Sequence, residues 1–536
     1  MKYINSSVIL LLIALMCFLG LYEIYPRPGW VDSAMYLGYA MNPNIYNVHD
    51  LVAHNYQGSR LGYIVPLHFL MEDFGIFDGR LIYVVFLYSA YIFSVMVLAK
   101  CFINKTVERM LVCMLFILNP GFISSIFYGG ADGPAAVQLL LAVSLLICAI
   151  NSGAQFKKNI FAILSGVFLI LSVSSHIFAA VPCFLIFPAL IYHLNAKRIL
   201  LPLVFGMAYA LYLCDHIGYQ LGLDKFYFLY SLPWAKISAF KGVGAAFVDP
   251  LDRQIREAIF WIPIFITMLF FWFVIPKFPS RGAKNFSLML IAVINIIGPI
   301  IICTLYDVVT KGNTIATPAY FNIIYPSFVL GLVCMISLNI KTLGSDVCTN
   351  SSKYIKRIRC CLMLILLASI FFNFTADHIQ SVFSYNNVDS ESFYRSEIAF
   401  MDRIKSRGLD TRKVKFVFTA AGIEGEGNPR VYKDYYKRSP RYQDYLDSLV
   451  GLFLWDRSIL LRLLPENDLE KQHSINPKKN EPLVFLGRNE DEVHRLVKRF
   501  EKFLRGYTPT NYECYDDKYY PWCFVDYEYE PPKPAG

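Results

Sequence analysis

The chain has 536 residues, of which 56% are hydrophobic, 16% aromatic and only 17% charged. Such a composition is typical of a protein whose main solvent is lipid, and it excludes a soluble enzyme. The formal charge of +9 does not indicate a nucleic-acid partner, because the excess lies in short loops, where membrane topology and anionic lipids account for it.

Eleven apolar segments of the sequence are each near the length that crosses a hydrocarbon layer of about 30 Å. We therefore predict an α-helical polytopic membrane protein, with its membrane domain over residues 1–376. The first segment has no small-x-small cleavage pattern, so we expect an uncleaved span rather than a signal peptide. The segments lie near residues 8–26, 81–99, 107–127, 133–150, 160–175, 177–193, 199–217, 257–276, 286–306, 320–340 and 360–376.

The Lys and Arg residues of the connecting loops sort to one side of these spans. The clusters lie around Lys105, Lys157, Arg198, Arg281 and Arg357. Since positive loops stay in the cytoplasm, this pattern predicts a cytoplasmic N-terminus and an outer C-terminus. Most acidic and histidine residues of the loops then lie on the outer face, where we expect the chemistry of the protein.

The first outer loop, residues 27–80, is too long for a simple connector and too aromatic for a disordered segment. Its run from Leu61 to Leu67 is amphipathic and suits a helix in the plane of the lipid headgroups. We expect the loop to form a lid or vestibule over the helical bundle.

After Asp377 the composition changes to that of a soluble domain, predicted over residues 377–536 on the outer face. Apolar patterns at 413–419 and 482–487 predict strands, and helical periodicity follows at 442–464 and again from Asn489 to Leu504. This indicates a small α/β domain, ending in a Tyr-rich, acidic tail from Tyr507 onward. Neither a phosphate loop nor a Gly-x-Ser-x-Gly motif occurs in it.

Most of the 13 cysteines lie in or beside apolar spans, where they act as small hydrophobic residues. Cys514 and Cys523 are different, because they form the only pair in the outer C-terminal segment. In an oxidising compartment we expect them to form a structural disulfide. No Cys/His cluster has the spacing of a zinc site.

Two outer-face carboxylates and one histidine are the candidates for chemistry. Asp32 follows the first span and is suited to accept a proton from an attacking sugar hydroxyl, although it equally suits a helix cap. Asp132 lies in a Gly-rich turn before the fourth span, which is also an ordinary helix start. His176 lies at the outer turn between the fifth and sixth spans, where a hydrogen bond to a helix end is the simpler role. Polar groups at several outer span ends predict a common cavity.

Two cations lie on the otherwise cation-poor outer side, Arg60 in the first loop and Lys311 in a later one. A guanidinium offers a planar fork to phosphate and an ammonium offers a compact charge. Both residues therefore suit phosphate recognition, and both equally suit contact with lipid headgroups.

These features together resemble the GT-C superfamily of membrane glycosyltransferases. They are an acidic residue soon after the first span, amphipathic segments in the first loop, the Asp132-Gly133-Pro134 turn, the segment from Tyr320 to Pro326, and an outer soluble domain. The likeness is to the bacterial branch with O-antigen serotype-converting glucosyltransferases, protein mannosyltransferases and lipid A aminoarabinose transferases. The protein mannosyltransferase pattern has paired acidic residues, whereas here Ser33 follows Asp32.

The resemblance implies inverting, single-displacement transfer of a hexosyl group, such as glucosyl, from a polyprenyl-phosphate carrier. The acceptor would be a glycan such as the O-antigen of lipopolysaccharide, on the periplasmic face of a bacterial inner membrane. Asp32 would be the general base, and Arg60 or Lys311 would hold the donor phosphate. Asp132 and His176 would complete the donor site, with no cofactor and no metal ligand assigned.

A polysaccharide polymerase or ligase remains an alternative, because such enzymes use outer arginines and histidines on similar lipid-linked substrates. A flippase would need ionisable residues deep inside the spans, and these are nearly absent from the apolar segments. A non-catalytic assembly scaffold is the third possibility.

Overall fold

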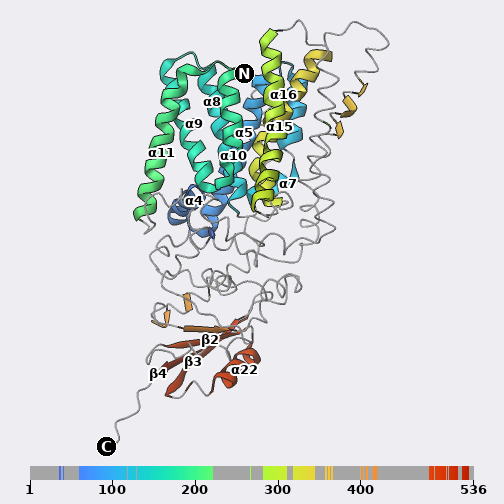
Figure 1. Ribbon diagram of the computed structural model, residues 1–536. Coiled ribbons are helices and arrows are strands. Elements are labelled where there is room, and N and C mark those ends of the chain that lie inside the picture. Colours follow the sequence, from blue (N-terminus) through green and yellow to red (C-terminus); the bar gives the residue numbers. More distant parts are fainter. Residues whose placement is uncertain are drawn as a thin grey trace, which may run out of the picture. The chain divides into compact units, whose positions relative to one another are not determined.

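The structure is a computed structural model, and its described residues form a helical bundle and a small α/β domain (Figure 1). Helices and strands fall into two compact units, one holding α4 to α16 and the other holding the strands and α22. This confirms the predicted fold class. Besides single residues and short pieces near 36–40, 266, 357–365 and 399–408, the described ranges are 60–117, 119–127, 130–220, 282–310, 318–343, 415–418, 482–487, 489–501, 504, 506–516 and 522–529.

Five helical segments among the described residues are long and apolar enough to cross a membrane, at Asp78–Phe102, Asp132–Asn151, Gln155–Ser175, Lys197–Gly218 and Phe286–Leu305. Shorter apolar helices cover Ile177–His193 and Asn322–Leu338. The predicted spans at 8–26, 257–276 and 360–376 lie outside the described residues, apart from isolated positions. The bundle elements are α4 (Leu61–Phe74), α5 (Ile76–Phe102), α6 (Thr106–Ile117), α7 (Pro120–Phe127), α8 (Asp132–Asn151), α9 (Gln155–Ser175), η3 (Ile177–Ala179), α10 (Ala180–His193), η4 (Lys197–Ile199), α11 (Leu200–Gln220), α15 (Gly282–Thr310) and α16 (Pro318–Leu343).

Helix α8 forms the centre of the bundle, packed by α5, α9 and α16. In its apolar segment 89% of the residues are buried inside the protein, against 28% in Lys197–Gly218. Small side chains such as Ala135 and Ala142 allow the neighbouring helices to approach closely. Helix α11 instead exposes large apolar side chains, including Phe205 and Tyr212, as suits a surface that faces lipid.

The prediction of one continuous span at 107–127 is wrong, because the segment is divided into α6 and α7. The residue before a proline avoids the helical region, and Asn119 precedes Pro120, the first residue of α7. Asn119 Oδ1 accepts the Phe122 N–H at 3.3 Å, while Tyr91 Oη donates to the Phe116 carbonyl at 2.6 Å. Side chains therefore bond two of the backbone groups at the break, and the Asn119 N–H donates to the Phe116 carbonyl at 3.1 Å.

The first outer loop is partly helical in its described portion. Helix α4 lies at one end of the bundle and packs on α5 and α9, and α5 begins at Ile76, so the span starts before the predicted loop end at Arg80 (Figure 1). Buried Leu61, Ile64 and Leu67 explain this packing. The run at 61–67 is therefore helical as predicted, but its apolar side packs against α5 and α9 rather than only lying among lipid headgroups.

The C-terminal domain is a four-stranded sheet in the order β1-β2-β4-β3, with β1 (Lys415–Phe418) parallel to β2 (Leu483–Gly487). Helix α22 (Glu490–Phe500) covers one face through Val493 and Val497. These elements confirm the two predicted strands and the helix after them, whereas the predicted helix at 442–464 lies outside the described residues.

The predicted tail from Tyr507 is wrong, because it holds the antiparallel pair β3 (Tyr507–Tyr515) and β4 (Trp522–Tyr529). Strand β3 is largely exposed and polar, so apolar alternation is missing from its sequence. Strand β4 is buried between β2 and β3. Cys514 and Cys523 are partners in the register of these strands and are joined by a disulfide.

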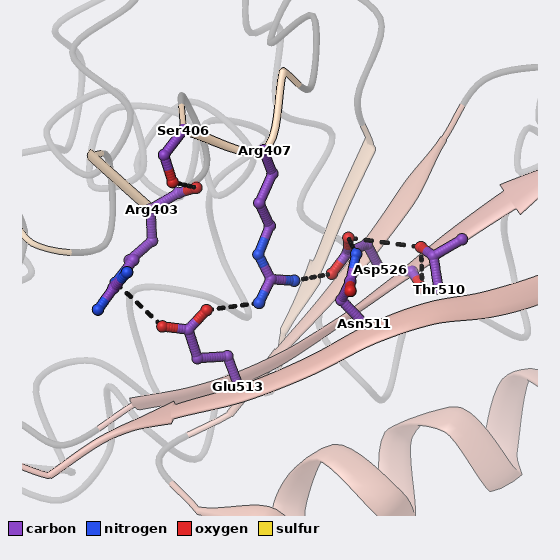
Figure 2. A network of polar contacts seen from close by, with 7 residues as sticks. All are labelled: Arg403, Ser406, Arg407, Thr510, Asn511, Glu513 and Asp526. Carbon is purple, nitrogen blue, oxygen red and sulfur yellow. Dashed lines mark hydrogen bonds and ion pairs between the residues drawn. The ribbon is translucent and has the colours of Figure 1, made fainter.

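A polar network covers the sheet face that bears Phe524 and Asp526 (Figure 2). Arg407 donates to Asp526 Oδ1 at 2.7 Å and to Glu513 Oε2, and its guanidinium lies 4.6 Å from the centre of the Phe524 ring. The side chain of Asp526 is 2% exposed, and its Oδ2 atom accepts from Asn511 at 3.2 Å. A buried carboxylate needs such partners, so the network holds Arg407 against the sheet.

We expect Arg407→Gln to destabilise the C-terminal sheet by about 2–3 kcal/mol, because buried Asp526 loses its charged partner. Hydrogen exchange of β3 and β4 amides in the full chain measures this. Arg403→Gln is the matched control, since Arg403 also bonds Glu513 but its side chain is 61% exposed, and an exposed pair contributes at most about 1 kcal/mol. Equal effects of the two variants would contradict the role assigned to Asp526.

Candidate functional site

The candidate site lies at the end of the bundle where α4 packs, called here the α4 end. The N-termini of α5, α8 and α10 meet the C-termini of α7 and α9 there, as the chain direction requires (Figure 1). The Lys and Arg residues of the opposite turns, among them Lys105, Lys157 and Lys197, lie at the other end of the same helices. In the part of the chain that the structure describes, the Lys and Arg residues of these turns therefore lie at the end opposite α4.

Gly62 fixes the first turn of α4 to α8 and α9. Its N–H donates to Ser174 Oγ at 3.1 Å and its carbonyl accepts from Gln138 Nε2 at 2.8 Å. A Cβ at this position would lie 2.1 Å from the Leu171 carbonyl oxygen, so only glycine allows the approach. Ser175 Oγ donates to Gln138 Oε1 at 2.7 Å and completes the set of bonds.

Asp132 and His176 lie together at the α4 end, with His176 Nε2 3.2 Å from Asp132 Oδ1. The imidazole is buried, whereas the Asp132 side chain is 23% exposed. Asp132 is the first residue of α8, and His176 joins α9 to η3 in an extended conformation. The two outer turns predicted to converge are thus adjacent, and the roles of the two side chains stay predictions.

Arg60 precedes α4 and lies near this pair. Its carbonyl accepts the N–H groups of Tyr63 and Ile64, which places it at the N-cap. His176 lies between the helices at Gln155–Ser175 and Ile177–His193. Burial and, to a smaller extent, the positive charge of Arg60 hold the pKa of His176 well below its usual value. The imidazole is therefore neutral at neutral pH.

Arg80 is a second buried guanidinium at the α4 end, with 1% of its surface exposed. It donates to Tyr63 Oη at 2.7 Å and to the Phe127 carbonyl at 3.1 Å, joining α4, α5 and α7. The Tyr83 ring lies 5.7 Å from that of Tyr63, and its buried hydroxyl has no hydrogen-bond partner in the described part of the chain. A bound ligand is one group that would satisfy such a hydroxyl.

Of the residues singled out in the sequence, Arg60, Asp132 and His176 are described and lie at one end of the bundle. Asp32 and Lys311 lie outside the described residues. Arg80 and Gln138 were missed. Gln138 could have been identified, because it is the most polar side chain within the apolar run at 133–150. Arg80 lies at the predicted end of a loop, where an arginine is ordinary, so nothing in its local sequence indicated a role.

This arrangement suits a ligand that carries both an anionic group and hydroxyl groups. Buried guanidinium groups attract a phosphate, and a carboxylate accepts hydrogen bonds from hydroxyls. Within the described ranges, no three His, Cys, Asp or Glu side chains gather in the manner of a metal centre.

No protein-family model and no curated protein matches the sequence. Among solved structures, ArnT from Cupriavidus metallidurans bound to undecaprenyl phosphate is similar over 97% of this chain and 98% of its own, with 10% identity and a TM-score of 0.46. An oligosaccharyltransferase from Archaeoglobus fulgidus, in complex with zinc and sulfate, is similar over 82% of this chain, with 12% identity and a TM-score of 0.40. This chain covers 61% of that second protein.

Proposed function

We propose that the protein is a membrane glycosyltransferase that moves a glucosyl or other hexosyl group from a polyprenyl-phosphate carrier to a glycan acceptor such as O-antigen. The observation that carries the proposal is the presence of Arg60, Arg80 and the bonded Asp132–His176 pair at one end of an apolar bundle. A lipid-linked sugar phosphate needs such a combination. Its tail requires an apolar surface, its phosphate requires cations, and its sugar requires hydrogen-bonding groups.

The proposed reaction is a single displacement at the anomeric carbon. A hydroxyl oxygen of the acceptor forms the new bond as the bond from the anomeric carbon to the phosphate oxygen breaks, and polyprenyl phosphate leaves. Asp32 takes the proton of the attacking hydroxyl as general base. Arg60 stabilises the charge that grows on the leaving phosphate, with Lys311 as a further candidate.

We further propose that the α4 end faces the periplasm of a bacterial inner membrane. The separation of loop cations from the α4 end supports this orientation. In a protein whose native cysteines outside the Cys514–Cys523 disulfide are replaced by serine or alanine, a cysteine in place of Gly312 should react with a membrane-impermeant reagent, while one in place of Lys157 should not. Labelling at position 157 without labelling at 312 would reverse the orientation.

The direct test of the function is mass spectrometry of lipids that co-purify with the full chain. We expect a polyprenyl monophosphate carrying one hexose. A diphosphate carrier with an oligosaccharide would instead favour a polymerase or ligase, and the absence of any carrier lipid together with no sugar transfer would favour a scaffold.

Arg60→Gln should weaken binding of undecaprenyl phosphate by about 10- to 100-fold, because a charge-assisted contact to phosphate is lost. Titration of the purified protein with this lipid measures the change. Lys157→Gln removes an exposed cation at the other end of the bundle and should leave the affinity unchanged. A wild-type affinity in Arg60→Gln would assign the phosphate to other cations.

A further inference from the structure

We propose that His176 is a positioning residue, which fixes the Asp132 carboxylate as the hydrogen-bond acceptor for a hydroxyl group of the transferred sugar. This inference rests on the proposed function and assigns a part of the substrate to the pair. In this role His176 touches no substrate atom, and it acts through Asp132.

The proton on the imidazole is placed by the backbone of η3. The Phe178 N–H donates to His176 Nδ1 at 3.3 Å, so Nδ1 acts as the acceptor and carries no proton. The neutral ring then carries its proton on Nε2, the atom that lies 3.2 Å from Asp132 Oδ1. The contact is therefore an N–H donor bonded to a carboxylate oxygen.

The backbone of His176 is hydrogen-bonded on both sides of the residue, which fixes the position from which the imidazole extends. The His176 N–H donates to the Ser172 carbonyl at 3.0 Å, and the His176 carbonyl accepts from Ala179 at 2.8 Å. Ser172 Oγ in turn donates to the Ala135 carbonyl at 2.7 Å, which ties α9 to the first turn of α8, where Asp132 lies. The donor and its acceptor are thus fixed on two helices that are bonded to one another.

The burial of the two side chains separates their tasks. Both ring nitrogens of His176 are engaged, Nδ1 by the Phe178 N–H and Nε2 by Asp132, whereas the Asp132 side chain is 23% exposed, so the carboxylate is the group of the pair that can accept from a ligand. Because a hydrogen bond from His176 leaves a carboxylate further lone pairs, Asp132 can accept from a hydroxyl as well.

The nearby charge of Arg60 indicates that this hydroxyl belongs to the sugar of the donor lipid. Arg60 lies near enough to His176 for its positive charge to lower the pKa of the imidazole, and His176 is bonded to Asp132, so a cation and an oriented carboxylate both lie at the α4 end. In a lipid-linked sugar phosphate, the phosphate and the sugar hydroxyls are also neighbours. A phosphate at Arg60 would bring a hydroxyl of its own sugar toward Asp132, and the carboxylate would contribute to the choice of sugar.

The test compares two kinds of lipid on the full chain. The affinity for undecaprenyl phosphate measures the phosphate contacts alone. The second lipid is undecaprenyl phosphate that carries glucose, galactose or mannose, and the variants are tested with whichever of these three the wild-type protein binds most tightly. We expect His176→Leu to lower the affinity for the sugar-bearing lipid about tenfold and to leave that for undecaprenyl phosphate unchanged. His176→Gln, whose amide restores an N–H donor, should recover most of the loss, and Asp132→Asn should behave like His176→Leu.

Equal losses for both lipids in His176→Leu would overturn the proposal, because the residue would then hold the phosphate or the fold. So would unchanged binding, a failure of His176→Gln to recover, a wild-type protein that binds no sugar-bearing lipid better than undecaprenyl phosphate, or a dependence of sugar binding on a divalent cation. Retained binding of undecaprenyl phosphate shows that a variant is folded. If the wild-type protein binds neither lipid better than phosphatidylglycerol, the proposed function itself fails.

Discussion

Gly62→Ala is expected to abolish binding of the lipid donor and to destabilise the bundle by about 3 kcal/mol or more. The added Cβ would lie 2.1 Å from the Leu171 carbonyl oxygen and 2.7 Å from Ser175 Oγ. Backbone atoms of a packed helix cannot yield to such an overlap, so the first turn of α4 must separate from α9. Its bonds to Ser174 and Gln138 are then lost, and Arg60 leaves its place beside His176.

The measurement is thermal unfolding in detergent together with titration by undecaprenyl phosphate. Gly153→Ala serves as the matched control, because a Cβ at Gly153 would meet nothing within 4 Å. We expect this variant to keep the wild-type unfolding temperature and affinity. A Gly62→Ala protein that binds the lipid normally would show that α4 does not determine the position of Arg60.

Asp32→Asn is expected to lower turnover by roughly 10²–10⁴-fold with little change in donor affinity, if Asp32 is the general base. An amide keeps the size of the side chain and removes its capacity to take the proton of the attacking hydroxyl. Sugar transfer in a single-turnover assay, beside titration with the donor lipid, separates the two effects.

Asp73→Asn is the control for this variant, since Asp73 is an exposed acid of α4 with no assigned role. Its turnover should match that of the wild-type protein. Near-normal transfer by a folded Asp32→Asn protein would remove Asp32 from the mechanism, and a parallel loss of donor affinity would make it a binding residue instead.

The positions of long spans could be predicted from the sequence because lipid imposes a length and an apolar composition on them. α8 and α9 match the predicted runs at 133–150 and 160–175 closely. The division of the third span at Asn119 could not be predicted from the sequence, because side chains far apart in the chain stabilise it. Tyr91 donates to the Phe116 carbonyl at the end of α6, and Asn119 donates to Tyr325 at 3.3 Å.

The candidate site could be located only in part. Asp132 and His176 stood out because each is a lone ionisable group at the end of an apolar run on the same side. Arg80 and Gly62 gave no such signal, because their importance lies in what they contact across the bundle, namely the Phe127 carbonyl and the backbone of Leu171. Local periodicity in the sequence does not indicate where two helices approach each other closely.

Strand β3 was not predicted from the sequence for a different reason. Its sequence is polar because most of its side chains are exposed, so it lacks the alternation by which a half-buried strand is recognised. Its conformation follows from pairing with β4, whose buried Trp522, Phe524 and Val525 are themselves surrounded by Tyr and acidic residues in the sequence.

Strand β3 is also an edge strand of the sheet, and a bulge in it affects whether a second copy of the domain can pair with that edge. The register with β4 shifts between Pro509 and Asn511, which brings Thr510 and Asn511 together at Asp526. A proline cannot donate to a neighbouring strand, and a bulge twists the edge away from a flat partner. Pro509 and the bulge that follows it therefore disfavour the addition of a strand from a second copy to this edge, which is the first step of aggregation.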